Sequence, residues 1–116
     1  MRLLVVGAKH VRYPADVFTR LYEIDSDLNV TELLCDDAPG VGVVAQEWAK
    51  MRNIKIFKMA PDYELYGCVA RVARNVALVK VADRVVVFPD CDGKCGQHVE
   101  GMAIKRGKLV GSFRLQ

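Results

Sequence analysis

The chain has 116 residues, of which 52% are hydrophobic and 27% are charged, and its formal net charge is +3. This composition excludes a disordered or fibrous chain, and the length is typical of one domain with its own core. We therefore expect a single domain over residues 1–116. Lysines and arginines are spread along the chain without a basic tract, so no nucleic-acid partner is indicated.

No apolar run approaches the roughly 20 residues that a membrane span needs. The apolar stretch after Arg2 ends at Gly7, which is too short for a signal peptide. We expect no membrane partner and a cytoplasmic location. The cysteines are then expected to be reduced thiols rather than disulfides. They are Cys35, Cys68, Cys91 and Cys95.

The first half of the chain reads as two strands, each followed by a helix. Leu3–Val6 is a short apolar run typical of a strand buried on both faces, and Pro14–Asp25 follows with helical spacing. Val30–Cys35 predicts the second strand, which ends at a loop of acidic residues, proline and glycine. Apolar residues at intervals of three and four predict an amphipathic helix over Gly40–Asn53. Trp48, Met51 and Met59 are expected in the core.

The second half continues the alternation of strands and helices. Ile54–Met59 alternates apolar residues with lysines, which is typical of an exposed edge strand. Ala60–Tyr66 is expected to be a loop. The most hydrophobic run of the chain predicts the central strand, with a helix on either side of it and a short strand at the end. These elements are Gly67–Val81, Val85–Phe88, Gln97–Arg106 and Lys108–Ser112.

A stripe of valines runs along the helix predicted over Gly67–Val81. Their spacing places them on one face, which we expect to pack on the sheet. Arg71, Arg74 and Asn75 would then lie on the opposite side. The stripe consists of Val69, Val72, Val76 and Val79.

This alternation predicts an α/β fold, a Rossmann-like three-layer α/β/α sandwich with a parallel sheet of about five strands. In such sheets ligands bind outside the carboxyl ends of the strands, where the strand order reverses. The loops at that edge are Gly7–Tyr13, Asp36–Gly42 and Asp90–Gly96.

The motifs of the chain, in their order, resemble those of the SLOG superfamily. The stretch DDAPGVGVVAQEWAKMRNI contains a Trp-Ala pair, and GCVARVARNVALVKVADRVVVF contains an Arg-Asn pair. The first strand leads into VVGAKH, and the last glycine loop, PDCDGKCGQH, leads into a helix. This superfamily includes the DNA-processing protein DprA and the plant LOG nucleotide hydrolases. The chain is most similar to its small YspA-like branch of bacterial and phage proteins.

The resemblance implies a small nucleotide-like ligand, bound for sensing or sequestering, with no cofactor and with a homodimer as the usual assembly. Phosphate would lie at the last glycine loop, where helix amides and the helix dipole favour an anion. The ligand-binding residues that it implies are Gly7, Ala8, Lys9, His10, Asp37, Gly40, Gly42, Arg74, Asn75, Asp90, Gly93, Lys94, Gly96, Gln97 and His98.

The chain also departs from the family pattern. Asp36 and Asp37 stand in the second loop, where relatives carry glycines, an arginine and an aspartate, and two carboxylates there would repel a phosphate. They could accept hydrogen bonds from ribose hydroxyls, hold a divalent cation, or be solvated loop residues. In the last loop, Gly96 is followed by Gln97 instead of threonine.

Two other functions stay open. A phosphoribohydrolase that cleaves the N-glycosidic bond of a nucleoside monophosphate would use Arg74 to orient substrate and Glu100 to stabilise the developing oxocarbenium ion. A protein-interaction module with a degenerate pocket would use the loop at residues 63–66 as a contact surface or dimer seam. Cys35, Cys91, Cys95 and His98 do not follow a standard zinc spacing, and no metal site is expected.

Overall fold

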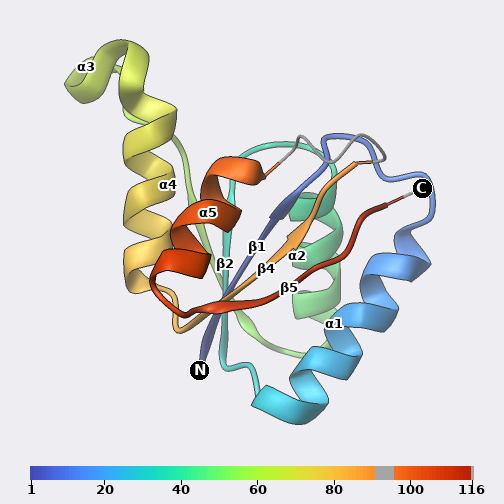
Figure 1. Cartoon of the computed structure of the whole chain (residues 1–116). Helices are drawn as coiled ribbons and strands as arrows, with labels where there is room; N and C mark the ends of the chain where they lie inside the picture. Colours follow the sequence, from blue (N-terminus) through green and yellow to red (C-terminus); the bar gives the residue numbers. More distant parts are fainter. Residues whose placement is uncertain (91–95, 116) are drawn as a thin grey trace.

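The computed structural model describes residues 1–90 and 96–115. Its middle layer is a five-stranded parallel sheet in the order β3-β2-β1-β4-β5 (Figure 1). This architecture confirms the predicted Rossmann-like α/β class. The strands are β1 (Arg2–Gly7), β2 (Glu32–Asp36), β3 (Lys55–Met59), β4 (Arg84–Phe88) and β5 (Leu109–Ser112).

Helices cover both faces of the sheet. Helices α1 and α2 pack on one face, and α4 and α5 pack on the other (Figure 1). None of the helices in the described part of the chain has the length and apolar character needed to cross a bilayer. The helices are α1 (Pro14–Leu28), α2 (Val41–Met51), α3 (Tyr63–Tyr66), α4 (Ala70–Val81) and α5 (Gln97–Lys105), and a 3-10 turn, η1 (Gly67–Val69), joins α3 to α4.

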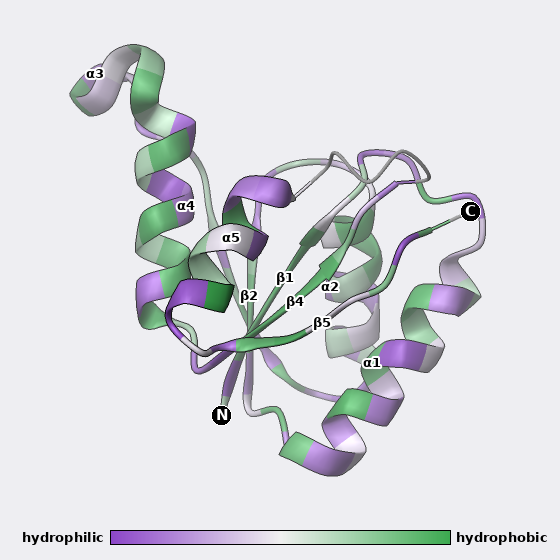
Figure 2. Cartoon of the chain, viewed as in Figure 1, coloured by the Kyte–Doolittle hydropathy of each residue, from purple (hydrophilic) through white to green (hydrophobic). Residues whose placement is uncertain are grey.

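The alternation of side chains along β1 shows how the two helical layers share one sheet. Leu3 and Val5 belong to the core under α1 and α2, whereas Leu4 and Val6 belong to the core under α4 and α5. Each buried aliphatic side chain contributes about 1.5–3 kcal/mol to folding. Figure 2 shows the resulting hydrophobic strands in the middle layer, between helices that carry both hydrophobic and hydrophilic residues.

The strand order confirms the edge position of β3 and changes one expectation. The run Val85–Phe88 is buried as predicted, but it lies in β4, between β1 and β5. The middle strand is β1, because the first two crossovers build the sheet toward β3 and the third returns to the other side of β1.

The first helix is longer than the spacing predicted, because it ends at Leu28 rather than at Asp25. Asn29 adopts the left-handed conformation that ends the helix. The Asp25 carboxylate is buried and accepts hydrogen bonds from Val30 N at 2.8 Å and Arg52 Nη2 at 2.9 Å. This contact ties the ends of α1 and α2 together.

Of the three expected core residues, Trp48 is confirmed and Met59 is half-buried at the margin of the core. Trp48 is fully buried and meets Tyr22 edge to face, and Met59 packs against the core under α4 and α5. The prediction for Met51 is wrong, since this residue is 66% exposed. Arg52, the exposed residue that ends α2, pairs instead with Asp25 at the end of α1.

The expected loop over Ala60–Tyr66 contains the short helix α3. The Asp62 carboxylate caps this helix by accepting a hydrogen bond from Leu65 N at 3.0 Å. An aspartate before a helical turn is a recognised start signal, so the sequence carried evidence for this element.

The valine stripe of α4 does not pack on the sheet as predicted. Val69, Val72 and Val76 are exposed, and only Val79 of the stripe is buried. The inward face instead carries Arg74, Asn75 and Leu78. At 100° per residue this face lies about a third of a turn from the stripe. Asp36 and Asp37 at the end of β2 pair with Arg74, and His98 on α5 contacts Asn75. These polar contacts favour the orientation in which Arg74 and Asn75 face inward.

Replacing Gly40 by alanine is expected to lower the free energy of unfolding by about 3 kcal/mol, measured by urea denaturation. Gly40 has a φ of +88°, and a Cβ there would overlap the backbone of Ala8 and Lys9. Gly101→Ala is the matched control, because this helical glycine has open space around it, and the change should stabilise by about 0.5–1 kcal/mol. Equal small effects of the two changes would contradict the close approach.

Candidate functional site

The carboxyl ends of β1 and β4 meet at the point where the strand order reverses. Gly7 pairs with Phe88 across these two strands, and a Cβ on Gly7 would overlap the Phe88 carbonyl. Ala8 N donates a hydrogen bond to Phe88 O at 2.9 Å, and Ala8 O accepts one from Val41 N at 3.0 Å. The backbone of Ala8 therefore joins β1, β4 and the start of α2.

A cleft of about 470 Å³ opens at this edge. The ends of β1 and β2 form its floor, and α3, α4 and the start of α5 form its walls. The structure brings six of the predicted ligand residues into the lining. They are Gly7, Lys9, Asp37, Arg74, Asn75 and Gly96.

Other predicted site residues do not line this cleft. Ala8 and Gly40 support it through backbone contacts between the ends of β1 and β4 and the start of α2. His98 touches a lining residue, and Glu100 lies in the first turn of α5. Gly93 and Lys94 lie outside the described residues. The predicted residues that are described but do not line the cleft are Ala8, His10, Gly40, Gly42, Asp90, Gln97, His98 and Glu100.

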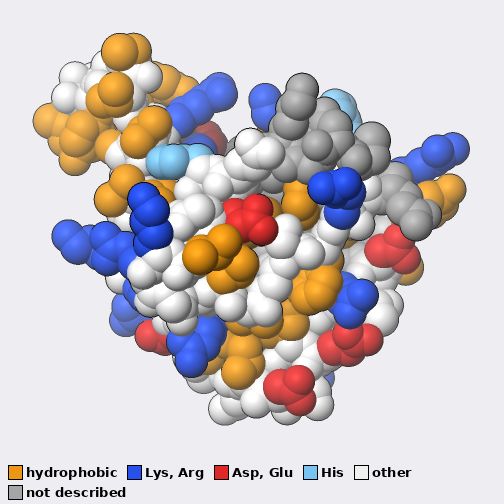
Figure 3. All heavy atoms as spheres, in the orientation of Figure 1, with side chains coloured by type: hydrophobic (Ala, Val, Ile, Leu, Met, Phe, Trp, Pro, Cys, Tyr) orange, Lys and Arg blue, Asp and Glu red, His pale blue; other side chains and the backbone are white. Residues whose placement is uncertain are grey.

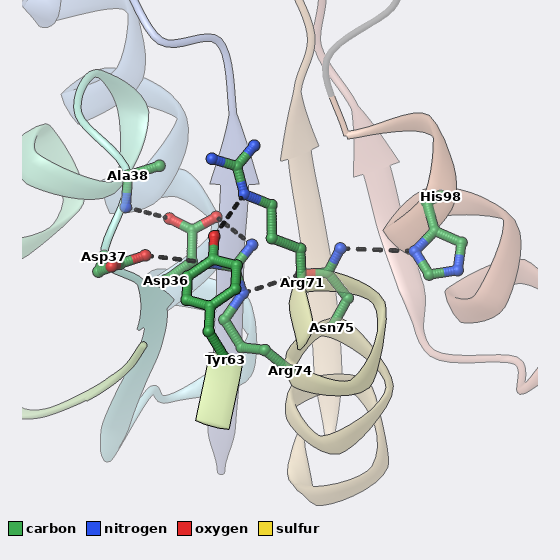
Figure 4. A network of polar contacts seen from close by, with 8 residues as sticks. All are labelled: Asp36, Asp37, Ala38, Tyr63, Arg71, Arg74, Asn75 and His98. Carbon is green, nitrogen blue, oxygen red and sulfur yellow. Dashed lines mark hydrogen bonds and ion pairs between the residues drawn. The ribbon is translucent and has the colours of Figure 1, made fainter. Parts of the chain in front are cut away.

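Arg74 is the most buried cation of the cleft. Only 9% of its side chain is exposed, and its Nη1 lies 3.0 Å from Asp37 Oδ1 while its Nη2 lies 4.0 Å from Asp36 Oδ2 (Figure 4). Asp36 also accepts a hydrogen bond from Ala38 N at 3.2 Å. The two carboxylates, which would repel each other and an anion, are thus neutralised in part by one guanidinium.

The polar contacts continue from Arg74 to helix α5. Arg74 Nε donates to Asn75 Oδ1 at 3.2 Å, and Asn75 Nδ2 lies 3.4 Å from His98 Nδ1 (Figure 4). A chain of polar groups therefore crosses from the end of β2, over α4, to the first turn of α5. These two contacts of Asn75, with Arg74 and with His98, explain why its side chain points toward the cleft.

Tyr63 and Arg71 are two cleft-lining residues that the sequence did not predict as ligand-binding. Tyr63, on α3, accepts a hydrogen bond at its hydroxyl from Arg71 Nε at 3.1 Å (Figure 4). This bond is the main cause of a raised pKa of Arg71, which stays cationic. Arg71 and Arg74 are three residues apart and so lie on one face of the helix. This spacing could have predicted Arg71 as a second cation of the same site.

The amino terminus of α5 also faces the cleft. This helix has nine residues, and its N-cap Gly96 and Val99 of its first turn line the cavity. The positive end of the helix dipole and the amides of the first turn favour an anion at such a place. Lys9 stands at the end of β1 as an exposed cation on the same cavity.

Of the cysteines considered as zinc ligands, the structure describes Cys35 alone. Cys35 is buried, and its Sγ lies 3.9 Å from Phe57 O. Cys91 and Cys95 lie outside the described residues. Among the described residues, no three His, Cys, Asp or Glu side chains are grouped so that they could hold a metal ion.

Comparisons with family models, with curated proteins and with solved structures found no match for this chain. The sheet order and the carboxyl-end cleft define a Rossmann-like α/β protein. The resemblance to the SLOG superfamily rests on sequence motifs.

Cys35 is expected to resist alkylation in the folded protein. Burial raises the pKa of its thiol from 9.0 to about 11, and the charge of Asp36 adds to this increase while Lys58 opposes it. At pH 8 its thiolate fraction is then about 100-fold below that of an ordinary thiol. Peptide mass spectrometry after brief iodoacetamide treatment should find the exposed Cys68 modified and Cys35 intact. Equal modification of the two thiols would contradict the buried position.

Proposed function

We propose that this protein binds a nucleotide or a nucleotide-derived small molecule in the carboxyl-end cleft, for sensing or sequestering. The observation that carries the proposal is the set of groups lining one cavity: three cations, two carboxylates, a tyrosine and a helix amino terminus. Their net charge favours an anion, and the carboxylates suit a ligand that also carries hydroxyl groups.

The phosphate end of the ligand is assigned to Lys9 and the amino terminus of α5. Lys9 forms no ion pair with any residue in the described ranges 1–90 and 96–115, whereas Arg74 is held by two carboxylates. A phosphate beside Lys9 would gain a cation without displacing an existing pair. This assignment agrees with the phosphate position that the resemblance to the SLOG superfamily implies.

The sugar and base are assigned to the opposite wall. Asp37 pairs with Arg74 but is 43% exposed, so its carboxylate can also accept hydrogen bonds from ribose hydroxyls. Tyr63 lines the cavity together with Pro61, and together they offer an apolar surface on which a base can stack. The ligand would then extend from α5 toward α3.

Binding is proposed here in preference to the two alternatives. Glu100, the expected catalytic carboxylate of a phosphoribohydrolase, is not among the cleft-lining residues. A pocket filled by side chains would favour a degenerate interaction module, and the open cavity of about 470 Å³ supports binding instead.

The proposal predicts that a nucleotide raises the melting temperature of the protein. A panel of AMP, ADP, ADP-ribose and cyclic dinucleotides should contain a ligand that adds about 5 °C at tenfold excess over its Kd. Lys9→Ala should weaken this ligand about tenfold in calorimetric titration, because a charge-assisted contact to phosphate is lost. Tyr63→Ala should weaken it by a similar factor.

Each of these variants has a matched control elsewhere on the surface. Lys50→Ala removes an exposed lysine of α2, and Tyr13→Ala removes a tyrosine that is 52% exposed, close to the 55% of Tyr63. Neither control residue lines the cleft, so both should leave the affinity unchanged. A panel without any hit, or equal losses in variants and controls, would overturn the proposal.

A further inference from the structure

Arg71 lines the cleft but is paired with no carboxylate of the described residues. The neighbouring Arg74 differs in this respect, because it forms ion pairs with Asp36 and Asp37. The side chain of Arg71 instead donates a hydrogen bond from Nε to the Tyr63 hydroxyl at 3.1 Å. A neutral hydroxyl does not cancel the charge of a guanidinium, so this cation is available to a ligand in the cleft.

The hydrogen bond to Tyr63 leaves the outer edge of the Arg71 guanidinium open. Because the bond uses Nε, the two terminal nitrogens Nη1 and Nη2 remain as donors. Figure 4 shows these nitrogens pointing away from the Tyr63 ring. Two parallel N–H donors match two oxygens of one phosphate, and a side chain already held at Nε loses less conformational freedom on binding. Arg71 is thus preorganised to bind a phosphate.

Lys9 and Arg71 reach the cleft from different sides of the sheet. Lys9 follows β1, where its backbone lies against Gly40 at the start of α2, and Arg71 lies in the first turn of α4. Helices α2 and α4 cover opposite faces of the sheet. Figure 3 shows cationic side chains on the two sides of the notch beside the projecting α3 and α4. The cleft therefore offers two separate positions for anionic groups.

The second of these positions adjoins the carboxylate of Asp37. The raised pKa of Arg71 comes mainly from its hydrogen bond with Tyr63 and in smaller part from the charge of Asp37. The ribose assigned to Asp37 would therefore have Arg71 beside it. In nucleotide-binding α/β folds a carboxylate accepts hydrogen bonds from ribose hydroxyls, and an arginine at the same place accommodates a phosphate on the sugar. This cleft presents both groups to one sugar.

We propose that the ligand is a nucleoside 5′-phosphate with a second phosphate on the 2′ or 3′ hydroxyl of its ribose, and that Arg71 binds this second phosphate. The inference rests on the proposed nucleotide function of the cleft. The 5′-phosphate lies at Lys9 and the amino terminus of α5, and Asp37 accepts a hydrogen bond from the ribose hydroxyl that remains free. Tyr63 is a positioning residue for the second phosphate, because its hydroxyl holds Arg71.

Calorimetric titration of the full chain with AMP, adenosine 3′,5′-bisphosphate and adenosine 2′,5′-bisphosphate tests the second phosphate. One of the two bisphosphates should bind at least about tenfold more tightly than AMP, because it gains a charge-assisted, bidentate contact. The tighter isomer identifies the hydroxyl that carries the phosphate. ADP is the matched control ligand, since its second phosphate is attached to the first one and not to the sugar. Its affinity should not depend on Arg71.

Three variants test the residues through the ratio of the Kd of AMP to the Kd of the tighter bisphosphate. Arg71→Gln should lower this ratio from about ten to about one, because the cation is lost. Tyr63→Phe keeps the ring but removes the hydroxyl that holds Nε, so the ratio should fall to about three. Arg106→Gln is the matched control, because this exposed arginine ends α5 and does not line the cleft. It should leave the ratio unchanged.

The outcomes separate this inference from the proposed function. AMP that binds as tightly as both bisphosphates, or a preference that persists in Arg71→Gln, would overturn the inference and leave nucleotide binding standing. A preference lost to the same extent in Arg106→Gln would overturn it in favour of general charge attraction. Failure of all the nucleotides to bind would overturn the proposed function and this inference with it. Circular dichroism would verify that every variant is folded.

Discussion

The buried guanidinium of Arg74 is the contact on which both the cleft and the exposed face of α4 depend. It joins α4 to the carboxyl end of β2 through Asp36 and Asp37. Because Arg74 points inward, Asn75 reaches α5 and Leu78 enters the core on the same helical face. The valines one third of a turn away are consequently directed to solvent. One ion-pair network thus organises the inner wall of a cavity and the outer surface of the same helix.

The same network separates the two kinds of charge in the cleft. Arg74 is already paired with carboxylates, so the proposed anionic ligand would meet Lys9 and the amino terminus of α5 instead. Asp37 keeps part of its surface in water, where it can accept hydroxyl hydrogen bonds. An anionic ligand with hydroxyl groups satisfies both ends of this arrangement, and a purely anionic or purely neutral ligand satisfies only one.

Local patterns predicted most of the fold, since short apolar runs and helical spacing marked all five strands and the four longer helices. The edge position of β3 followed from its alternating lysines. The orientation of α4 could not be predicted in this way, because Val72 and Leu78 belong to two apolar stripes that compete for the sheet. The choice depends on Asp36 and Asp37, which are distant in sequence and meet Arg74 only in the fold. Six site residues followed from loop position and family motifs, whereas Tyr63 was hidden in a segment expected to be a loop.

A double-mutant cycle between Arg74 and the aspartate pair tests the central claim most directly. Urea denaturation would measure the free energy of unfolding for Arg74→Ala, for Asp36→Asn with Asp37→Asn, and for all three changes together. We predict a coupling energy of about 1–2 kcal/mol, because removing the cation leaves two uncompensated carboxylates that the asparagines no longer present. Additive effects, with a coupling near zero, would contradict the claim that this ion pair orients α4.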